Sequence, residues 1–253
     1  MEKGKRFIEP GTPQPDSKYH IDILADGPYL VYGNPPIQQE IFVLNEEKIP
    51  WDYVKGHQYP TSHEPTALCR CGHSKNHPYC DGTHAHIDWD STLNADNIPL
   101  LEKAELYDGP TVQLADNPEY CAHARICMAR GNVWKLIEES DDPEARDLAA
   151  HESSFCPAGR LKLWDKQEEA FYEPPLKPAI GLIEDPQNEC SGPLWVTGGI
   201  PLNGPDGTAY EQRNRVTLCR CGASSNKPYC DGSHITIHFQ DNLPLNTELE
   251  EKM

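Results

Sequence analysis

The sequence predicts an α+β protein of three modules, in which two small β-rich modules flank an insert that contains both helices and strands. Pro (24) and Gly (18) are frequent among the 253 residues, and this composition favours short strands and ordered loops over long helices. An internal repeat places residues 68–84 on residues 218–234, with 13 of 17 positions identical. We therefore expect module boundaries at 1–95, 96–175 and 176–253.

Each copy of the repeat is preceded by a predicted strand. Residues 27–31 (GPYLV) and 192–196 (GPLWV) are similar to each other and rich in β-branched and aromatic side chains. The first copy has about 15 more residues between this strand and the repeat, which we interpret as an elaborated loop. This loop is expected around residues 42–63.

The insert between the two copies has helical composition in two stretches, residues 117–135 and 142–151. Asp142 followed by Pro143 is a helix-start signal, because Asp caps the helix and Pro is accommodated in the first turn. The acidic residues around this signal are interpreted as a solvated face rather than a docking patch.

The net charge excludes several classes of partner. The chain has 22 Lys and Arg against 40 Asp and Glu, a formal charge of -18, so it would be repelled by nucleic acid and by anionic membranes. A redox protein with a basic docking surface is a better partner. No apolar run approaches the roughly 18 residues of a membrane span, and the first residues lack a secretory signal, so we expect a cytoplasmic protein.

Eight candidate ligands have the spacing C-x-C-x8-C-x3-H in the two copies of the repeat. They are Cys69, Cys71, Cys80 and His84, and Cys219, Cys221, Cys230 and His234. In a reducing compartment such cysteines are metal ligands rather than disulfides, and three thiolates with one imidazole can hold zinc or an iron-sulfur cluster. The C-x-C spacing favours a cluster, because two neighbouring thiolates can bind one iron and leave the later Cys and His for a second.

Both copies resemble the signature of the CDGSH iron-sulfur family, the family of mitoNEET. The signature is C-x-C-x2-[S/T]-x3-P-x-C-D-G-[S/T/A]-H, and residues 69–84 and 219–234 match it at every fixed position. The resemblance implies a [2Fe-2S] cluster at each site, held by three Cys and one His. It also implies that the two β-rich modules pair, here as an intramolecular pseudo-dimer within a monomer. The chain departs from the family pattern by having a whole domain between its modules.

Three further predictions concern residues inside the repeat. Substituting one thiolate by imidazole makes the cluster less anionic and raises its reduction potential, and a titratable ligand makes the cluster releasable. Asp-Gly at 81–82 and 231–232 predicts a tight turn that presents N–H groups to sulfur. Arg70 and Arg220, which lie between ligands, either offset cluster charge or are exposed to solvent.

A third site is predicted in the insert. Cys121 and Cys127, with Cys156 before Pro157, are similar to the ferredoxin pattern C-x2-C-x2-C…C-P, but Ala124 stands where the central Cys would be. The segment also resembles a divergent single-cluster ferredoxin domain found beside CDGSH motifs. The three thiolates predict a [3Fe-4S] cluster in a ferredoxin-like insert.

Two alternatives to this three-iron cluster stay open. His123 or Cys190 could complete a [4Fe-4S] cluster, or the cysteines of the insert could be unligated core residues. Cys190 is otherwise expected to be a small buried hydrophobic residue.

The predicted function is electron transfer through these clusters, without substrate chemistry of its own. No nucleotide fingerprint, catalytic triad or flavin site is present in the sequence, so we do not expect an enzyme. Iron-sulfur cluster storage, cluster transfer or redox sensing is an alternative, because it would use the same labile His ligands. A zinc-binding interaction scaffold is a second alternative.

Overall fold

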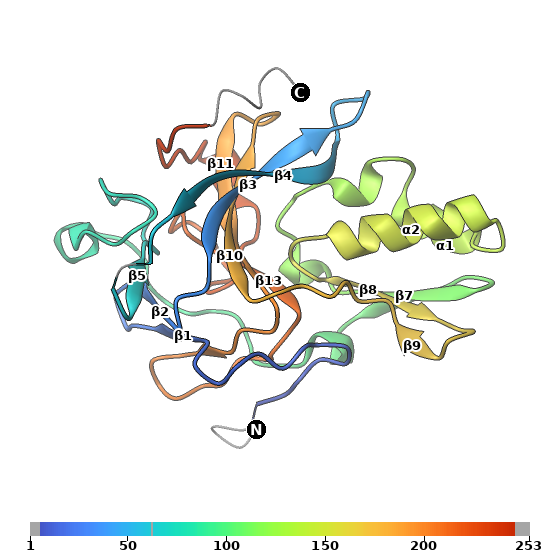
Figure 1. Ribbon diagram of the computed structural model, residues 1–253, viewed down its shortest axis with the longest axis horizontal. Helices are drawn as coiled ribbons and strands as arrows, with labels where there is room; N and C mark the ends of the chain where they lie inside the picture. Colours follow the sequence, from blue (N-terminus) through green and yellow to red (C-terminus); the bar gives the residue numbers. More distant parts are fainter. Residues whose placement is uncertain (1–5, 62, 246–253) are drawn as a thin grey trace.

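The computed structural model describes residues 6–61 and 63–245, which form an α+β fold dominated by three sheets (Figure 1). The strands are β1 (His20–Ile23), β2 (Tyr29–Tyr32), β3 (Ile37–Leu44), β4 (Pro50–Tyr59), β5 (Thr66–Leu68), β6 (Glu105–Asp108), β7 (Val112–Asp116), β8 (Leu161–Asp165), β9 (Ala170–Phe171), β10 (Ala179–Asp185), β11 (Cys190–Thr197), β12 (Leu202–Asn203) and β13 (Arg215–Leu218). The α-helices are α1 (Val133–Glu138), α2 (Pro143–Phe155) and α3 (Ser233–Thr236), and the 3-10 helices are η1 (Thr83–His86), η2 (Leu100–Glu102), η3 (Pro118–Tyr120) and η4 (Ile126–Met128).

Two of the sheets are built from corresponding strands of the two halves of the chain. In the first sheet, β2 lies between β1 and β5, and all of these pairs are antiparallel. In the second sheet, β11 lies between β10 and β13 with the same antiparallel pairing. Strands β2 and β11 are the two strands predicted ahead of the repeats, and both predictions are confirmed.

The two halves exchange a strand with each other. Strand β12 of the second half pairs in parallel with β1 of the first, with Ile21 opposite Leu202. In return, β3 of the first half pairs in parallel with β10 of the second, with Ile180 opposite Ile37. Each sheet is therefore completed by a strand from the other half, and neither half forms its sheet alone.

The loop expected at residues 42–63 is instead a long β-hairpin formed by β3 and β4. Its turn is stabilised by Asn45, whose side-chain oxygen accepts hydrogen bonds from the backbone N–H groups of Glu47 and Ile49. Lys48 in this turn adopts a left-handed conformation, with φ 61°. The loop prediction was wrong because β3 is buried on both faces and lacks the alternating pattern of a half-exposed strand.

The insert forms a separate sheet of β6, β7, β8 and β9 with α1 and α2 against it, on the right of Figure 1. Helix α2 confirms the second helical prediction: the side chain of Asp142 caps it by accepting from the N–H of Glu144, and Pro143 occupies its first turn. The acidic residues beside this cap are exposed, as predicted. The helical prediction for residues 117–135 was wrong, because the chain there makes two short 3-10 turns around a ligand-bearing loop and forms only the beginning of α1.

A hydrophobic core joins the first two sheets, and buried charges attach the insert to it. Tyr29 of β2 is fully buried and donates a hydrogen bond to the carbonyl oxygen of Cys219 in the other half. Lys162 of β8 is fully buried and forms ion pairs with Glu9 and Glu173. Among the described residues, no helix is long and apolar enough to cross a membrane.

Candidate metal centres

The N-terminal site consists of the first repeat's ligand candidates, at the end of β5 and the start of η1. The Sγ atoms of Cys69 and Cys71 lie 3.8 Å apart. The Sγ atom of Cys80 lies 3.3 Å from Nδ1 of His84. The four side chains therefore form two close pairs, one from each end of the repeat.

The C-terminal site repeats this arrangement between β13 and α3. The Sγ atoms of Cys219 and Cys221 are 3.7 Å apart, and Sγ of Cys230 is 3.3 Å from Nδ1 of His234. All four side chains are buried. The spacing predicted from sequence thus brings the same donor atoms together twice.

The grouping of donors into pairs fits a binuclear cluster better than a single ion. Two sulfurs on one metal at about 2.3 Å are separated by about 3.8 Å in tetrahedral geometry, which is the separation within each Cys pair. Among the described residues, no three His, Cys, Asp or Glu side chains converge on one point as a mononuclear site requires. Two irons, one for each pair of donors, would be held by this arrangement.

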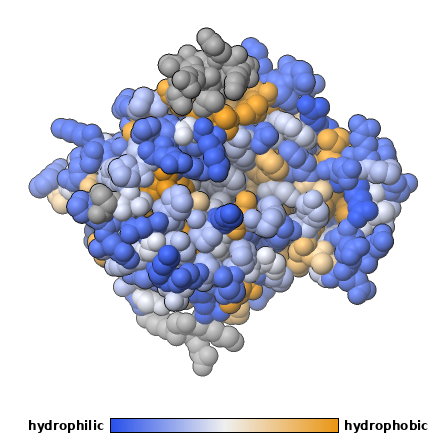
Figure 2. Space-filling model, in the orientation of Figure 1, coloured by the Kyte–Doolittle hydropathy of each residue, from blue (hydrophilic) through white to orange (hydrophobic). Residues whose placement is uncertain are grey.

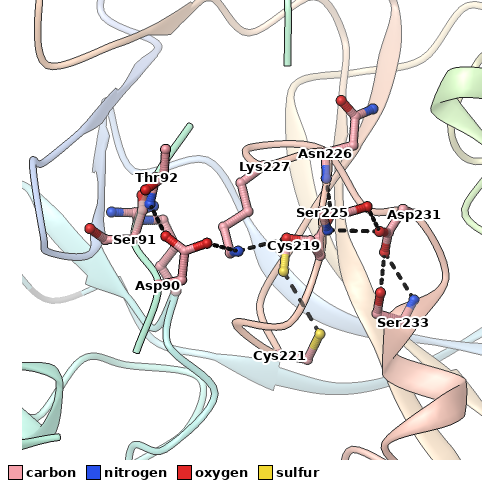
Figure 3. A network of polar contacts seen from close by, with 12 residues as sticks. Asp90, Ser91, Thr92, Cys219, Cys221, Ser225, Asn226, Lys227, Asp231 and Ser233 are labelled. Carbon is pink, nitrogen blue, oxygen red and sulfur yellow. Dashed lines mark hydrogen bonds and ion pairs between the residues drawn. The ribbon is translucent and has the colours of Figure 1, made fainter. Parts of the chain in front are cut away.

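The Asp-Gly residues after the third Cys of each repeat form the predicted tight turn. Asp231 accepts hydrogen bonds from the backbone N–H and hydroxyl of Ser233 and from the backbone N–H and hydroxyl of Ser225 (Figure 3). These bonds keep the pKa of Asp231 low, at about 2, against the opposing effect of burial. Gly232 follows in a left-handed conformation, and its N–H points at the Sγ of Cys230, 3.4 Å away.

Arg70 and Arg220 are buried, which excludes solvent exposure, one of the two alternatives left open for them. Each is 2% exposed. Arg70 donates to the carbonyl oxygens of Gly27 and Ser91. Arg220 donates to the carbonyl oxygen of Gly192 and forms ion pairs with two carboxylates. Both residues stand between two candidate ligand cysteines in the sequence, and both bring a buried positive charge into their CDGSH segment, which favours an anionic cluster.

The three candidate ligands of the insert line one pocket. Cys121 directly follows η3, Cys127 lies within η4, and Cys156 follows the last residue of α2. A loop joins η3 to η4. His123 and Arg125 in this loop have left-handed backbone conformations, with φ 57° and 65°. The loop is attached to β10 by an ion pair between Arg125 and Asp185.

Three thiols and no fourth line this pocket in the described part of the chain. Ala124 faces it from the position where the ferredoxin pattern has a Cys, and His123 is also among its lining residues. Cys190 is not: it lies on β11 opposite Asp185 and is 4% exposed, the buried position expected for it. The donor set of the pocket fits a cluster with three protein ligands.

Two families match the chain. Residues 26–85 and 191–235 match the family described as iron-binding zinc finger CDGSH type, and residues 107–166 match the family described as divergent 4Fe-4S mono-cluster. The chain carries two CDGSH segments with a divergent 4Fe-4S domain between them. It is therefore an iron-sulfur protein. No curated protein and no solved structure matches it.

The two CDGSH segments differ in how far their candidate ligands are buried. Cys230 and His234 are 2% and 4% exposed, whereas Cys80 and His84 are both partly exposed. Burial, with the nearby charge of Arg220, lowers the pKa of His234 to about 4. Near-identical sequences thus provide one shielded site and one open site.

The 4Fe-4S domain holds its thiols in a less polar environment than solvent. Burial raises the pKa of Cys121, and it raises the pKa of Cys127 to about 12. Iron would therefore be needed to stabilise these thiolates. Arg160 also lines the pocket, where it forms an ion pair with Asp116, and provides a fixed positive charge.

Sequence reasoning missed one pair of residues, His77 and Lys227, which occupy equivalent positions in the two CDGSH segments. Lys227 is buried and donates to the carbonyl oxygen of Ser224, and its Nζ lies 3.8 Å from Asp90 of the first half (Figure 3). His77 stacks edge-on against Phe239 of the second half. Both thus reach across to the other half of the chain. The sequence contained a signal for this pair, because positions 77 and 227 are one of the four places at which the two repeats differ.

Proposed function

We propose that this protein is an electron carrier with three iron-sulfur clusters. Two [2Fe-2S] clusters would each bind three Cys and one His, and one [3Fe-4S] cluster would bind Cys121, Cys127 and Cys156. The clusters supply reversible one-electron redox chemistry. The protein residues hold them, set their surrounding charge and limit the access of water. No substrate chemistry is proposed for the chain itself.

The observation that carries this proposal is the paired arrangement of donors in both CDGSH segments. Each segment offers two sulfurs on one side and a sulfur with an imidazole nitrogen on the other. Two pairs suit two irons. A cluster with one neutral imidazole carries less negative charge than one with four thiolates, so it accepts an electron more readily.

The three-iron assignment rests on the missing donor in the insert. Ala124 cannot bind iron, and the described pocket contains three thiols. A cuboidal cluster with only three protein ligands is satisfied by losing the unligated iron. His123, which also lines the pocket, is the remaining candidate for a fourth ligand.

The reciprocal strand pairing supports an intramolecular pseudo-dimer, with the insert as a ferredoxin-like unit. Strand β12 completes the first sheet and β3 completes the second, as expected for two similar modules related by an internal two-fold axis. Since each module already has its partner within the chain, we propose that the protein is a monomer.

A redox protein with a basic docking surface is the proposed partner. The chain has a formal charge of -18, which would steer a cationic protein toward it and increase the association rate. The face drawn in Figure 2 is mostly hydrophilic, and its hydrophobic residues occur in separate groups. Such a face is suited to charge-guided, short-lived encounters.

Iron and sulfide analysis of anaerobically purified protein tests the proposal. The three clusters predict about seven irons and about eight labile sulfides per chain, and potentiometric reduction should be reversible with this content unchanged. About eight irons would identify the middle cluster as [4Fe-4S]. Zinc without labile sulfide would support the interaction-scaffold alternative and overturn the proposed function.

A second candidate function, cluster transfer, is favoured by the partial exposure of His84 and Cys80. An exposed imidazole ligand can be protonated and released, which would open the outer iron to an acceptor. Incubation with an apo-ferredoxin, and separately with the same ferredoxin carrying its cluster, distinguishes the two functions. Net movement of iron and sulfide to the acceptor would favour transfer, whereas reduction of a loaded acceptor with no loss of iron would favour electron carriage.

A further inference from the structure

The insert covers the C-terminal CDGSH site and leaves the N-terminal one open. A Cβ atom added at Gly232 would lie 2.8 Å from Cγ of His123, so the imidazole of the insert lies directly on the turn between Cys230 and His234. The equivalent Gly82 has the same left-handed conformation but nothing within 4 Å of an added Cβ. The two turns thus differ in this contact.

Residues of the middle site and of the C-terminal site are also packed together. Cys230 belongs to one buried cluster with Ala122 and Ala158, against which Cys156 packs. His123 and His234 both line a second small pocket between the two sites. Cys156 of the middle site and Cys230 of the C-terminal site therefore pack in the same group of small side chains.

The C-terminal site also contacts the N-terminal site on its other side. A Cβ atom at Gly72 would lie 2.7 Å from the carbonyl carbon of Cys221, and one at Gly222 would lie 2.9 Å from that of Cys71. The backbone that carries the ligands of one site therefore touches the ligand backbone of the other. The C-terminal site lies between the other two.

The exposure of the ligands agrees with this arrangement, in which the C-terminal site lies between the N-terminal site and the middle site of the insert. The four ligands of the C-terminal site are all buried, whereas each of the other two sites has partly exposed ligands. A partner protein can therefore approach the N-terminal site and the middle site of the insert, which are the two outer sites. It cannot reach the buried ligands of the C-terminal site, which lies between them.

We propose that the three clusters form a linear relay: the N-terminal cluster, the C-terminal cluster and then the middle cluster, with His123 as the contact between the last two. This inference rests on the proposed function. Each step moves one electron between neighbours, so that one cluster is oxidised and the next is reduced, and no bond forms or breaks. The redox-protein partner supplies or accepts the electron at an outer site. Because tunnelling falls exponentially with distance, the two direct contacts determine the order.

EPR power saturation of the partly reduced, fully loaded protein tests this order. A spin close to a second paramagnetic centre relaxes faster and saturates at higher microwave power. A three-iron middle cluster is paramagnetic in both oxidation states. It should therefore increase the relaxation rate of the C-terminal [2Fe-2S] signal more than that of the N-terminal signal. The variants His234→Cys and His84→Cys identify the two signals, because each shifts the signal of its own cluster.

Removal of the middle cluster gives the decisive control. Cys156→Ser should lower the half-saturation power of the C-terminal signal several-fold and bring it to the value of the N-terminal signal. Equal relaxation of the two signals in wild-type protein with a loaded middle cluster would overturn the relay while leaving the proposed function intact. Absence of labile sulfide would overturn both.

His123→Ala tests the contact itself. It should slow electron equilibration between the C-terminal and middle clusters about tenfold in rapid-freeze EPR after mixing with limiting dithionite, with iron and sulfide content as in the wild type. Loss of iron would instead make His123 a cluster ligand and overturn its assignment as a contact only. His57→Ala, at an exposed histidine on β4, is the matched control and should equilibrate at the wild-type rate. Unchanged equilibration in His123→Ala would overturn the role of this residue.

Discussion

Gly72→Ala should destabilise the protein more than an alanine substitution at any left-handed glycine in open space. Gly72 has φ 80°, and a methyl group there would meet the backbone of Cys221 at 2.7 Å. The left-handed conformation alone costs roughly 1–2 kcal/mol for an L-residue. Forcing a methyl group into packed backbone adds about 1–3 kcal/mol, because neither chain segment can move without displacing a ligand. The sum is a loss of about 2–5 kcal/mol in the free energy of unfolding.

Gly207→Ala is the matched control, since Gly207 has φ 85° and nothing within 4 Å of an added Cβ. Gly207→Ala should lower the free energy of unfolding only by the cost of the left-handed conformation, roughly 1–2 kcal/mol. Gly222→Ala should match Gly72→Ala, because its contact with Cys71 is reciprocal. Anaerobic urea unfolding followed by far-UV circular dichroism measures the differences. If Gly72→Ala were no less stable than Gly207→Ala, the back-to-back packing of the twin sites would be refuted.

Three further predictions concern the clusters and the insert. Ala124→Cys should raise the iron content by one per chain, because a thiolate would now reach the vacant corner of the middle cluster. It should also abolish the near-isotropic EPR signal of the oxidised protein. An EPR-silent wild type would instead indicate an existing fourth ligand. His84→Cys and His234→Cys should each lower one [2Fe-2S] potential by on the order of 100–300 mV in redox titration, and unchanged potentials would remove these residues from the ligand set. Burial raises the pKa of Glu152 to about 7, above its usual 4.5, so stability should fall by as much as about 3 kcal/mol as the pH rises from 4.5 to 7. Urea unfolding of Glu152→Gln should show a smaller slope than the wild type, because Glu184, whose pKa burial also raises to about 7, still contributes. An unchanged slope would contradict the assignment.

The close pairing of the Cys and His side chains could be predicted from sequence because it is local. Cys69 to His84 and Cys219 to His234 each span one loop, and the Asp-Gly turn that shapes the loop is encoded within it. The cap of α2 was equally local, since Asp142 and Pro143 act on the next turn of the chain. Short-range chemistry of this kind depends little on the rest of the fold.

Features that depend on contacts between distant segments could not be predicted. The exchange of β3 and β12 joins residues far apart in the chain, and no turn residue marks it. Burial of Arg220 depends on Glu184 and Asp241, which neutralise it only in the folded protein. The hairpin of β3 and β4 is different. Asn45 gave a turn signal that could have revealed it.

The same long-range contacts predict that the N-terminal cluster has the higher reduction potential of the twin pair. Reduction adds negative charge, and burial of the C-terminal ligands makes that charge more costly. Arg220 is paired with two carboxylates, which cancel its attraction for an electron, whereas Arg70 is bonded to neutral carbonyl oxygens. The positive charge of Lys227 favours reduction of the C-terminal cluster and so opposes this order of potentials. The nearby carboxylate of Asp90 offsets part of that charge.

The N-terminal signal should therefore appear first in an EPR-monitored redox titration. His77→Lys should raise the potential of the N-terminal cluster further, because it introduces a permanent positive charge at the position that Lys227 occupies in the second segment. Lys227→Met removes that charge and should lower the potential of the C-terminal cluster, so the gap between the two should widen in both variants. If the C-terminal signal appeared first in the wild type, the charge of Lys227 would outweigh burial and the carboxylates around Arg220, and the open N-terminal site would be the low-potential end of the pair.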